Sequence, residues 1–351
     1  MKAETLLPLG KLDPGLRAPD AAFDLAAVGP QAKVIDEMGY YSLLMEETKD
    51  DPFQVLALAA AATQRVRIGT SVAIAFARSP FVLAQSAWTA QKISQGRFEL
   101  GIGSQVRGHI RRRFGMPWHP PGPWMRDYVG ALKAIWHSWQ HGTPLDYNSA
   151  HYQLNLNVPL FTPAPLQHPH IPVQVAAVNE YMAGVAAEVA DGVRLHPVCS
   201  PQYIAQTLLP AIQRGLARRE ADTPFDICLK PLIATAADEQ GLRKRIAITR
   251  QRLAFYCSTP AYVAAFAGAG LSDFCAEMAK LSKAGKWDTM ATLVDDKLLH
   301  EYVVVATYDK LADTLQSRYG ELVQRIEVSI PVETQADQLQ LRRIVQELSD
   351  M

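Results

Sequence analysis

Small and polar residues follow two strand-like segments of this chain, and their types suit close contact with a flat polar ligand. Val66 to Ala73 is short and rich in β-branched residues. A second segment, Arg97 to Gly103, runs directly into Ser104 and Gln105. Glycine leaves the backbone bare, so a ligand can approach it closely. Because ligands of parallel α/β proteins bind at the carboxyl ends of strands, the pattern predicts an enzyme with a cofactor here.

Candidates for proton transfer stand at two other strand ends. Glu46, Glu47 and Thr48 follow the segment Tyr40 to Met45, and His196 ends a later segment. A carboxyl group near an apolar ring can have a raised pKa and act as a general acid or base. A salt bridge at the rim or a helix cap explains the two glutamates equally well. A lone histidine is more often a core residue than a catalytic one.

A phosphate site is expected at Ala176-Ala177-Val178-Asn179, between a strand and a helix that begins near Glu180. Free backbone N–H groups at a helix start bind anions, and small residues let a phosphate come close. Asn is also a common N-cap residue, and we expect Asn179 to serve both purposes.

The most concentrated charge is the basic run Arg107 to Arg113, which includes His109. A solvated helix face is the usual explanation of such a run. Its place after a strand equally favours recognition of an acidic cofactor tail or an acidic substrate. Trp118 begins an aromatic, proline-rich loop on the same side, which forms a pocket wall or packs the following helix.

An alternation of strands and helices positions these residues. Strands are expected at 5–9, 40–45, 66–73, 98–102, 173–177, 193–196, 227–234 and 325–330, and helices at 31–38, 52–63, 80–94, 123–139, 180–189, from 201, over 239–300 with breaks, and at 310–318. This pattern predicts one α/β domain, a (β/α)8 TIM barrel spanning 1–351, with excursions near 141–172 and 257–306. An open doubly wound sheet is disfavoured, because no Gly-x-Gly-x-x-Gly fingerprint follows the first strand.

Composition narrows the class of protein. The chain has 351 residues, 48% of them hydrophobic, so it can bury a large core. Its 35 basic and 35 acidic residues cancel, which argues against nucleic acid and membrane partners. The four cysteines lack the spacing of a zinc site or disulfide framework, so no metal is expected. The start lacks a signal-peptide pattern and no apolar run spans a bilayer, which predicts a cytoplasmic protein.

Several stretches together resemble the bacterial luciferase-like monooxygenase superfamily, and the branch they match best is that of the deazaflavin (coenzyme F420) dependent oxidoreductases. The likeness covers nearly the whole chain. The stretches are Gly69 to Val72, Phe76 to Pro80, Gly96 to Gly103, Arg111 to Trp118, Ala176 to Asn179 and Glu188 to Gly192.

The resemblance implies that the isoalloxazine-like ring lies at the carboxyl ends of the barrel strands. It implies a non-prolyl cis peptide at Ser71–Val72 behind the ring, and a phosphodiester on the amides before residue 180. Residues assigned to the cofactor are Thr48, Ser71, Val72, Ala73, Gly103, Ser104, Gln105, Ala176, Ala177, Val178 and Asn179. Residues assigned to its phosphate or polyglutamate tail, or to the substrate, are Arg78, Arg107, His109 and Trp118.

The implied function is hydride transfer between a reduced deazaflavin and an organic substrate that the sequence does not identify. Related enzymes often carry a histidine after strand two and a glutamate after strand four. Here the strand-two loop has no histidine and Val106 stands at the glutamate position, which argues against a sugar-phosphate dehydrogenase.

Two alternatives remain open. One is a flavin mononucleotide (FMN) dependent, two-component monooxygenase that needs a separate reductase. The other is a non-catalytic cofactor-binding barrel, suggested by the missing histidine and glutamate. The family also implies a homodimer that acts on a small molecule.

Overall fold

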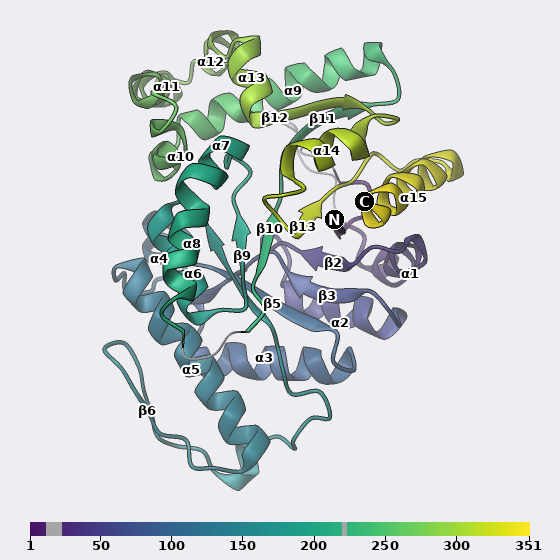
Figure 1. Cartoon of the computed structure of the whole chain (residues 1–351). Helices are drawn as coiled ribbons and strands as arrows, with labels where there is room; N and C mark the ends of the chain where they lie inside the picture. The colour runs from purple at the N-terminus through teal and green to yellow at the C-terminus, as the bar shows by residue number, and fades with distance from the viewer. Residues whose placement is uncertain (12–22, 220–222) are drawn as a thin grey trace.

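Eight parallel strands close into a barrel in the computed structural model, which describes residues 1–11, 23–219 and 223–351 (Figure 1). Their order round the barrel is β1 (Lys2–Leu6), β2 (Ser42–Met45), β3 (Arg67–Thr70) continued by β4 (Ala73–Ile74), β5 (Phe98–Gly103), β8 (Val173–Ala177), β9 (Gly192–Leu195), β10 (Asp226–Leu229) and β13 (Arg325–Glu327), which pairs back with β1. The predicted (β/α)8 barrel is therefore confirmed. Because all these strands are parallel, their carboxyl ends meet at one rim.

Helices connect the strands and cover the outside of the barrel (Figure 1). They are α1 (Val28–Met38), α2 (Pro52–Ala62), α3 (Pro80–Ile93), α4 (Arg107–Arg112), α5 (Pro121–His141), α6 (Glu180–Val189), α7 (Pro201–Tyr203), α8 (Leu209–Leu216), α14 (Leu311–Tyr319) and α15 (Gln335–Asp350). A further helix, α9 (Glu239–Cys257), lies beyond the rim formed by the strand ends. Local chemistry sets their starts: the Asp51 carboxylate accepts from Phe53 N before α2, and the Ser79 hydroxyl accepts from Val82 N before α3. Proline follows each of these caps, where its missing N–H costs nothing.

The segment 227–234, expected as one strand, is two strands. β10 belongs to the barrel, whereas β11 (Leu232–Ala236) leaves it and pairs in parallel with β12 (Val303–Thr307). Pro231 lies at the break, and proline cannot donate the hydrogen bond that a central strand needs. The expectation of a single strand was wrong because the apolar pattern continues across this proline.

Two excursions leave the barrel. The first contains the antiparallel hairpin of β6 (Tyr147–Asn148) and β7 (Gln153–Leu154). The second contains α10 (Val263–Ala267), α11 (Ser272–Lys283), α12 (Trp287–Leu293) and α13 (Asp296–Tyr302). These helices lie with α9, β11 and β12 at the top of Figure 1, beyond the rim.

The C-terminal helix α15 was not predicted. Its buried residues Leu341, Ile344, Val345 and Leu348 follow helical spacing, and a capping box of Thr334 and Asp337 begins it. The first strand also begins earlier than expected, at Lys2 instead of Thr5.

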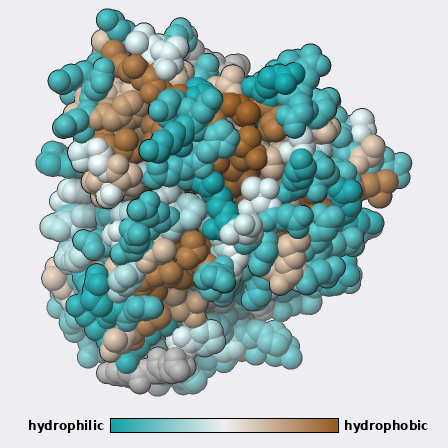
Figure 2. Space-filling view, turned by 45° about the horizontal axis from the view of Figure 1, so that its top comes forward, coloured by the Kyte–Doolittle hydropathy of each residue, from teal (hydrophilic) through white to brown (hydrophobic). Residues whose placement is uncertain are grey.

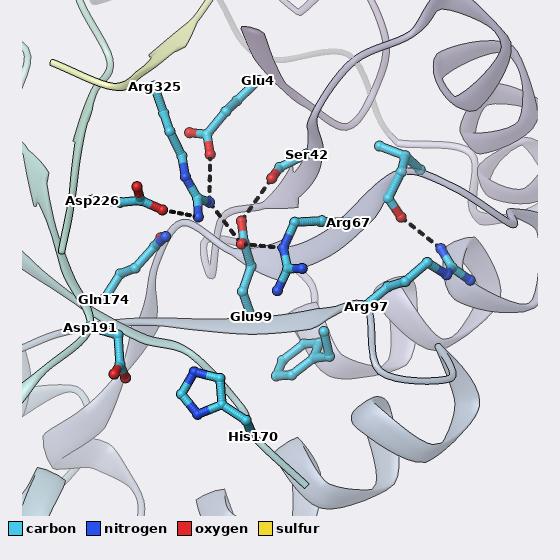
Figure 3. A network of polar contacts seen from close by, with 12 residues as sticks. Glu4, Ser42, Arg67, Arg97, Glu99, His170, Gln174, Asp191, Asp226 and Arg325 are labelled. Carbon is cyan, nitrogen blue, oxygen red and sulfur yellow. Dashed lines mark hydrogen bonds and ion pairs between the residues drawn. The ribbon is translucent and has the colours of Figure 1, made fainter. Parts of the chain in front are cut away.

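A charged network fills the centre of the barrel (Figure 3). Arg325 Nη1 donates to Glu99 Oε2 at 2.8 Å and to Glu4 Oε1 at 3.3 Å. Glu99 also accepts from Ser42 Oγ at 2.9 Å and from Arg67 Nε at 3.0 Å. Each strand of the closed barrel contributes one member: Glu4, Ser42, Arg67, Glu99, Gln174, Arg194, Asp226 and Arg325.

Apolar residues gather in separate patches on the face seen in Figure 2, with polar side chains between them. In the described parts of the chain, no helix is long and apolar enough to cross a membrane.

Candidate functional site

Small residues meet at the carboxyl ends of three neighbouring strands. The peptide bond between Ser71 and Val72, which separates β3 from β4, is cis, as the resemblance implies. A Cβ atom on Gly103, the last residue of β5, would lie 2.8 Å from Val72 Cγ2 and 3.5 Å from the Cβ of Ala176 on β8. The ends of these strands therefore lie close together. We call this group of residues the small-residue rim: Ser71, Val72, Gly103 and Ala176. Gly103 is buried, and its missing side chain lets Val72 pack closely against the end of β5.

Hydrogen bonds to two other barrel strands, β5 and β9, fix the backbone between β3 and β4. Thr70 Oγ1 donates to the carbonyl oxygen of Gly101 at 2.6 Å, and Ser71 Oγ accepts from Arg194 Nε at 3.1 Å. Only glycine fits at position 101, because a Cβ there would lie 2.0 Å from the carbonyl oxygen of Thr70. The charged interior of the barrel therefore supports the small-residue rim directly.

The start of α6 lies next to this rim. Asn179 Oδ1 accepts from Met182 N at 2.9 Å, which confirms its role as N-cap.

On the β5 side of the small-residue rim, Gln105 has a left-handed backbone (φ 54°), and its Oε1 accepts from Val106 N at 2.9 Å. Ala73 and Ala177 are buried in their strands, and Ser104 and Val178 are half-buried.

A cavity of about 310 Å³ opens beside the other strands of the rim. It lies between the ends of β1, β2, β9, β10 and β13 on one side and α9 on the other. Charged and polar residues that line it include Lys11, Glu46, Thr48, Lys230, Arg252, Tyr256 and Glu327.

Glu46 is the anionic centre of this cavity. Its Oε2 lies 2.7 Å from Lys11 Nζ and its Oε1 lies 2.8 Å from Lys230 Nζ. Burial alone would raise the pKa of Glu46, but the two lysines outweigh burial and lower the pKa to about 2. Glu46 is therefore an ionised partner of two cations and a poor proton donor at neutral pH.

This assignment predicts a pH effect on stability. Folding lowers the pKa of Glu46 from 4.5 to about 2. The ion pairs of Glu46 therefore stabilise the fold fully when the pH is above the pKa of the unfolded chain, 4.5, and this stabilisation is lost as the pH falls toward the pKa of the folded chain, about 2. We expect the variant Glu46→Gln to lose less stability than the wild type between about pH 5 and about pH 2. Glu99 has a similarly low pKa, so the stability of the variant still decreases with falling pH, but less steeply than that of the wild type. Urea unfolding at several pH values measures the difference, with Glu321→Gln as an exposed control. Identical slopes for Glu46→Gln and wild type would contradict the assignment.

Glu47 is bound to Arg78. Glu47 Oε2 lies 2.6 Å from Arg78 Nη1 and accepts from Ile74 N at 2.7 Å. Arg78 Nη2 also lies 3.4 Å from Asp51 Oδ2. Both side chains thus join the strand-two loop to β4, and each neutralises the other.

His196 follows β9 and packs against two tyrosines, with ring centroids 4.1 Å from Tyr262 and 5.1 Å from Tyr256. Burial, assisted by the charge of Lys230, lowers the pKa of His196 to about 3. The imidazole is therefore neutral at pH 7.

The basic run forms α4, and Arg107 and His109 are exposed on it. Arg113 Nη2 donates to the carbonyl oxygen of Thr48 at 3.2 Å, which connects this segment to the strand-two loop. Trp118 is half-buried, with its ring 6.4 Å from that of Phe76, just beyond β4. The tail-binding candidates therefore lie on the β4 and β5 side of the rim.

Sequence reasoning missed Lys230, which directly follows β10, and Glu327, which ends β13. The available signal was their position at strand ends, the same signal that selected Glu46. It was hidden because Lys230 fell inside the expected strand 227–234 and Glu327 inside the expected strand 325–330.

The family model described as luciferase-like monooxygenase matches residues 6–325. An uncharacterized protein of Mycobacterium tuberculosis is 40% identical over 303 residues, which are 86% of this chain and 89% of that protein. A putative coenzyme F420-dependent oxidoreductase of the same organism is 27% identical over 286 residues, covering 74% of this chain and 77% of the relative.

Among solved structures, the coenzyme F420-dependent tetrahydromethanopterin reductase from Methanopyrus kandleri has the same fold. It superposes with a TM-score of 0.74 at 20% identity, over 99% of this chain and 98% of the other. The match to the family model covers most of the chain, including the small-residue rim and the cavity-lining residues other than Glu327 and Ser329. The protein therefore belongs to the luciferase-like monooxygenase family.

Proposed function

We propose that the protein is an oxidoreductase that moves a hydride between the deazaflavin coenzyme F420 and an organic substrate. The observation that carries this proposal is the small-residue rim, with its cis peptide at Ser71–Val72 and with Val72 packed where Gly103 has no side chain. Such a surface suits one face and one edge of a flat tricyclic ring. The relative described as a putative coenzyme F420-dependent oxidoreductase supports the choice of deazaflavin.

The residues present fit this cofactor. Val72 would support the ring, and the backbone at Gly103 and Ser104 would contact its polar edge. The open amides after Asn179 would receive the phosphodiester, and Arg107 and His109 are exposed where an acidic tail could reach them. When bound, the cofactor supplies the hydride chemistry, and the protein supplies orientation and electrostatics.

The cavity on the other half of the rim is the proposed substrate site. Its walls combine apolar residues of β11 and α9, such as Leu232 and Ile248, with the lysine and glutamate pairs. Apolar walls exclude water, and fixed charges orient a polar substrate. Glu46 acts there as a positioning charge, since both its oxygens are held by lysines.

The proposal is tested by titrating the purified protein with oxidised coenzyme F420 and, separately, with FMN, while following cofactor absorbance and fluorescence. We expect saturable binding of coenzyme F420 and much weaker binding of FMN. Tight binding of FMN without binding of coenzyme F420 would overturn the choice of deazaflavin.

The second candidate is an FMN-dependent monooxygenase that receives reduced FMN from a separate reductase. The description of the family model favours it. A non-catalytic cofactor-binding barrel is the third, favoured by the ion pairs that hold Glu46 and Glu47. A bound cofactor that no tested substrate oxidises or reduces would support the third.

A further inference from the structure

Four apolar side chains project from a short segment of the first excursion. Leu156, Leu160 and Phe161 are 73%, 86% and 69% exposed, and Val158 between them is also exposed. The first three are the most exposed large apolar side chains in the parts of the chain that the structure describes. Single exposed apolar residues are normal on a protein surface, whereas a contiguous group of them marks an interaction site. We call these four residues the excursion patch.

The backbone that carries the excursion patch is fixed to helix α5. Residues 159–161 form a single 3-10 turn. Before this turn, Asn157 Nδ2 donates to Ser138 Oγ of α5 at 3.2 Å. After it, Leu166 N donates to Gln140 Oε1 of α5 at 2.9 Å. The excursion patch is therefore a preformed surface, and little ordering of the chain opposes its burial by a partner.

The sequence around the excursion patch contains no formal charge. Residues 147–179 include no Asp, Glu, Lys or Arg, although these residue types make up 20% of the chain. Nucleic acid, an anionic membrane or a strongly charged protein therefore meets no complementary charge here.

A second copy of the chain suits such a surface. Near the axis of a two-fold dimer each surface meets its own copy, so charged residues there would repel one another, and uncharged residues would not. The whole chain has a formal net charge of +0, so two copies do not repel each other at longer range either.

The first excursion is also large enough to support a dimer. A specific interface uses about 20–30 residues of each partner, and the excursion at 143–172 is a segment of this size. The part that contains β6 projects from the barrel at the lower left of Figure 1. The excursion patch would form the apolar core of the interface, and exposed uncharged residues such as Gln153, Asn155 and Gln167 would form its polar rim.

We propose that the excursion patch binds the same patch of a second copy of the chain, in a two-fold symmetric dimer. The apolar side chains that are exposed in the single chain become buried between the two copies, and the burial of this apolar surface stabilises the dimer. The inference is independent of the proposed cofactor and substrate, because no residue of the excursion patch belongs to the small-residue rim or lines the cavity.

The first test is analytical ultracentrifugation of the full chain at micromolar concentrations. We expect the wild type to be a dimer, and we expect Leu160→Asp and Phe161→Asp each to raise the dissociation constant by about 100-fold or more, because every interface contains the change twice. The matched control is Leu339→Asp, since Leu339 is 60% exposed on α15, and it should dimerise like the wild type. Circular dichroism checks that the variants are folded. A monomeric wild type, or a dimer that neither patch variant weakens, would overturn the proposal.

The second test locates the contact by hydrogen–deuterium exchange and mass spectrometry. The wild type is compared at concentrations above and below its dissociation constant. We expect the amides of 153–166 to exchange more slowly in the concentrated sample, and those of α15 to exchange at the same rate in both. Slower exchange confined to other surfaces, such as those of α2 and α3, would show that the dimer forms elsewhere and would contradict the proposal.

The third test examines a lipid surface as the occupant of the excursion patch. The wild type is mixed with neutral phosphatidylcholine vesicles, and the vesicles are sedimented. We expect the protein to stay in the supernatant, because its apolar side chains are covered by the second copy. Sedimentation of the wild type with the vesicles, lost in Leu160→Asp and kept in Leu339→Asp, would assign the excursion patch to lipid and overturn the dimer.

Discussion

Replacing Arg325 by methionine is expected to lower the free energy of unfolding by about 3–5 kcal/mol. Arg325 is 3% exposed and bonds Glu4, Glu99 and Asp226 at the centre of the barrel (Figure 3). Without it, the remaining arginines, Arg67 and Arg194, face two buried carboxylates, Glu4 and Glu99, and the partly exposed Asp226. An uncompensated buried charge costs far more than the pair contributes, because the charge keeps its desolvation penalty.

The loss is large relative to the stability of typical proteins, about 5–15 kcal/mol. Urea unfolding followed by circular dichroism measures it. The control is Arg343→Met on α15, where the ion pair with Glu347 is half-exposed and contributes about 0.3–0.5 kcal/mol. Equal losses for the two variants would show that the interior network does not depend on Arg325.

The barrel itself was predictable, because strand and helix patterns alternate along the chain. The charged interior was not. Glu99 stands between two apolar residues and Arg325 between Gln324 and Ile326, and nothing local shows that their side chains point inward toward each other. Their pairing joins residues 226 positions apart, so it exists only once the barrel has closed.

The site was predictable in part for the same reason. The residues of the small-residue rim stand within or next to their strands in the sequence, so Ser71 and Gly103 could be selected directly as candidates. The cavity depends on contacts between distant segments, such as Lys230 with Glu46, 184 positions apart. The role of Glu46 changes with this contact, because a carboxylate between two lysines is a fixed charge and a poor acid.

The substitution Gly103→Val is expected to weaken binding of coenzyme F420 at least tenfold, or by about 1.4 kcal/mol or more. Its Cβ would lie 2.8 Å from Val72 Cγ2, so the added side chain must displace Val72 or occupy the space where the ring is proposed to lie. Gly268→Val is the matched control, because a Cβ there has no neighbour within 4 Å and Gly268 is exposed.

The fold and the site can be separated in the same series. Gly101→Ala would place a Cβ 2.0 Å from the backbone of Thr70, so it should destabilise the barrel itself. At Gly103 the atoms nearest to an added Cβ belong to the side chains of Val72 and Ala176, so the thermal unfolding of Gly103→Val should change less than its affinity for the cofactor. Adding Val72→Ala to a Gly103→Ala variant should recover part of the binding, since it removes the atom in contact. Wild-type affinity in Gly103→Val would mean that the ring does not lie on the small-residue rim.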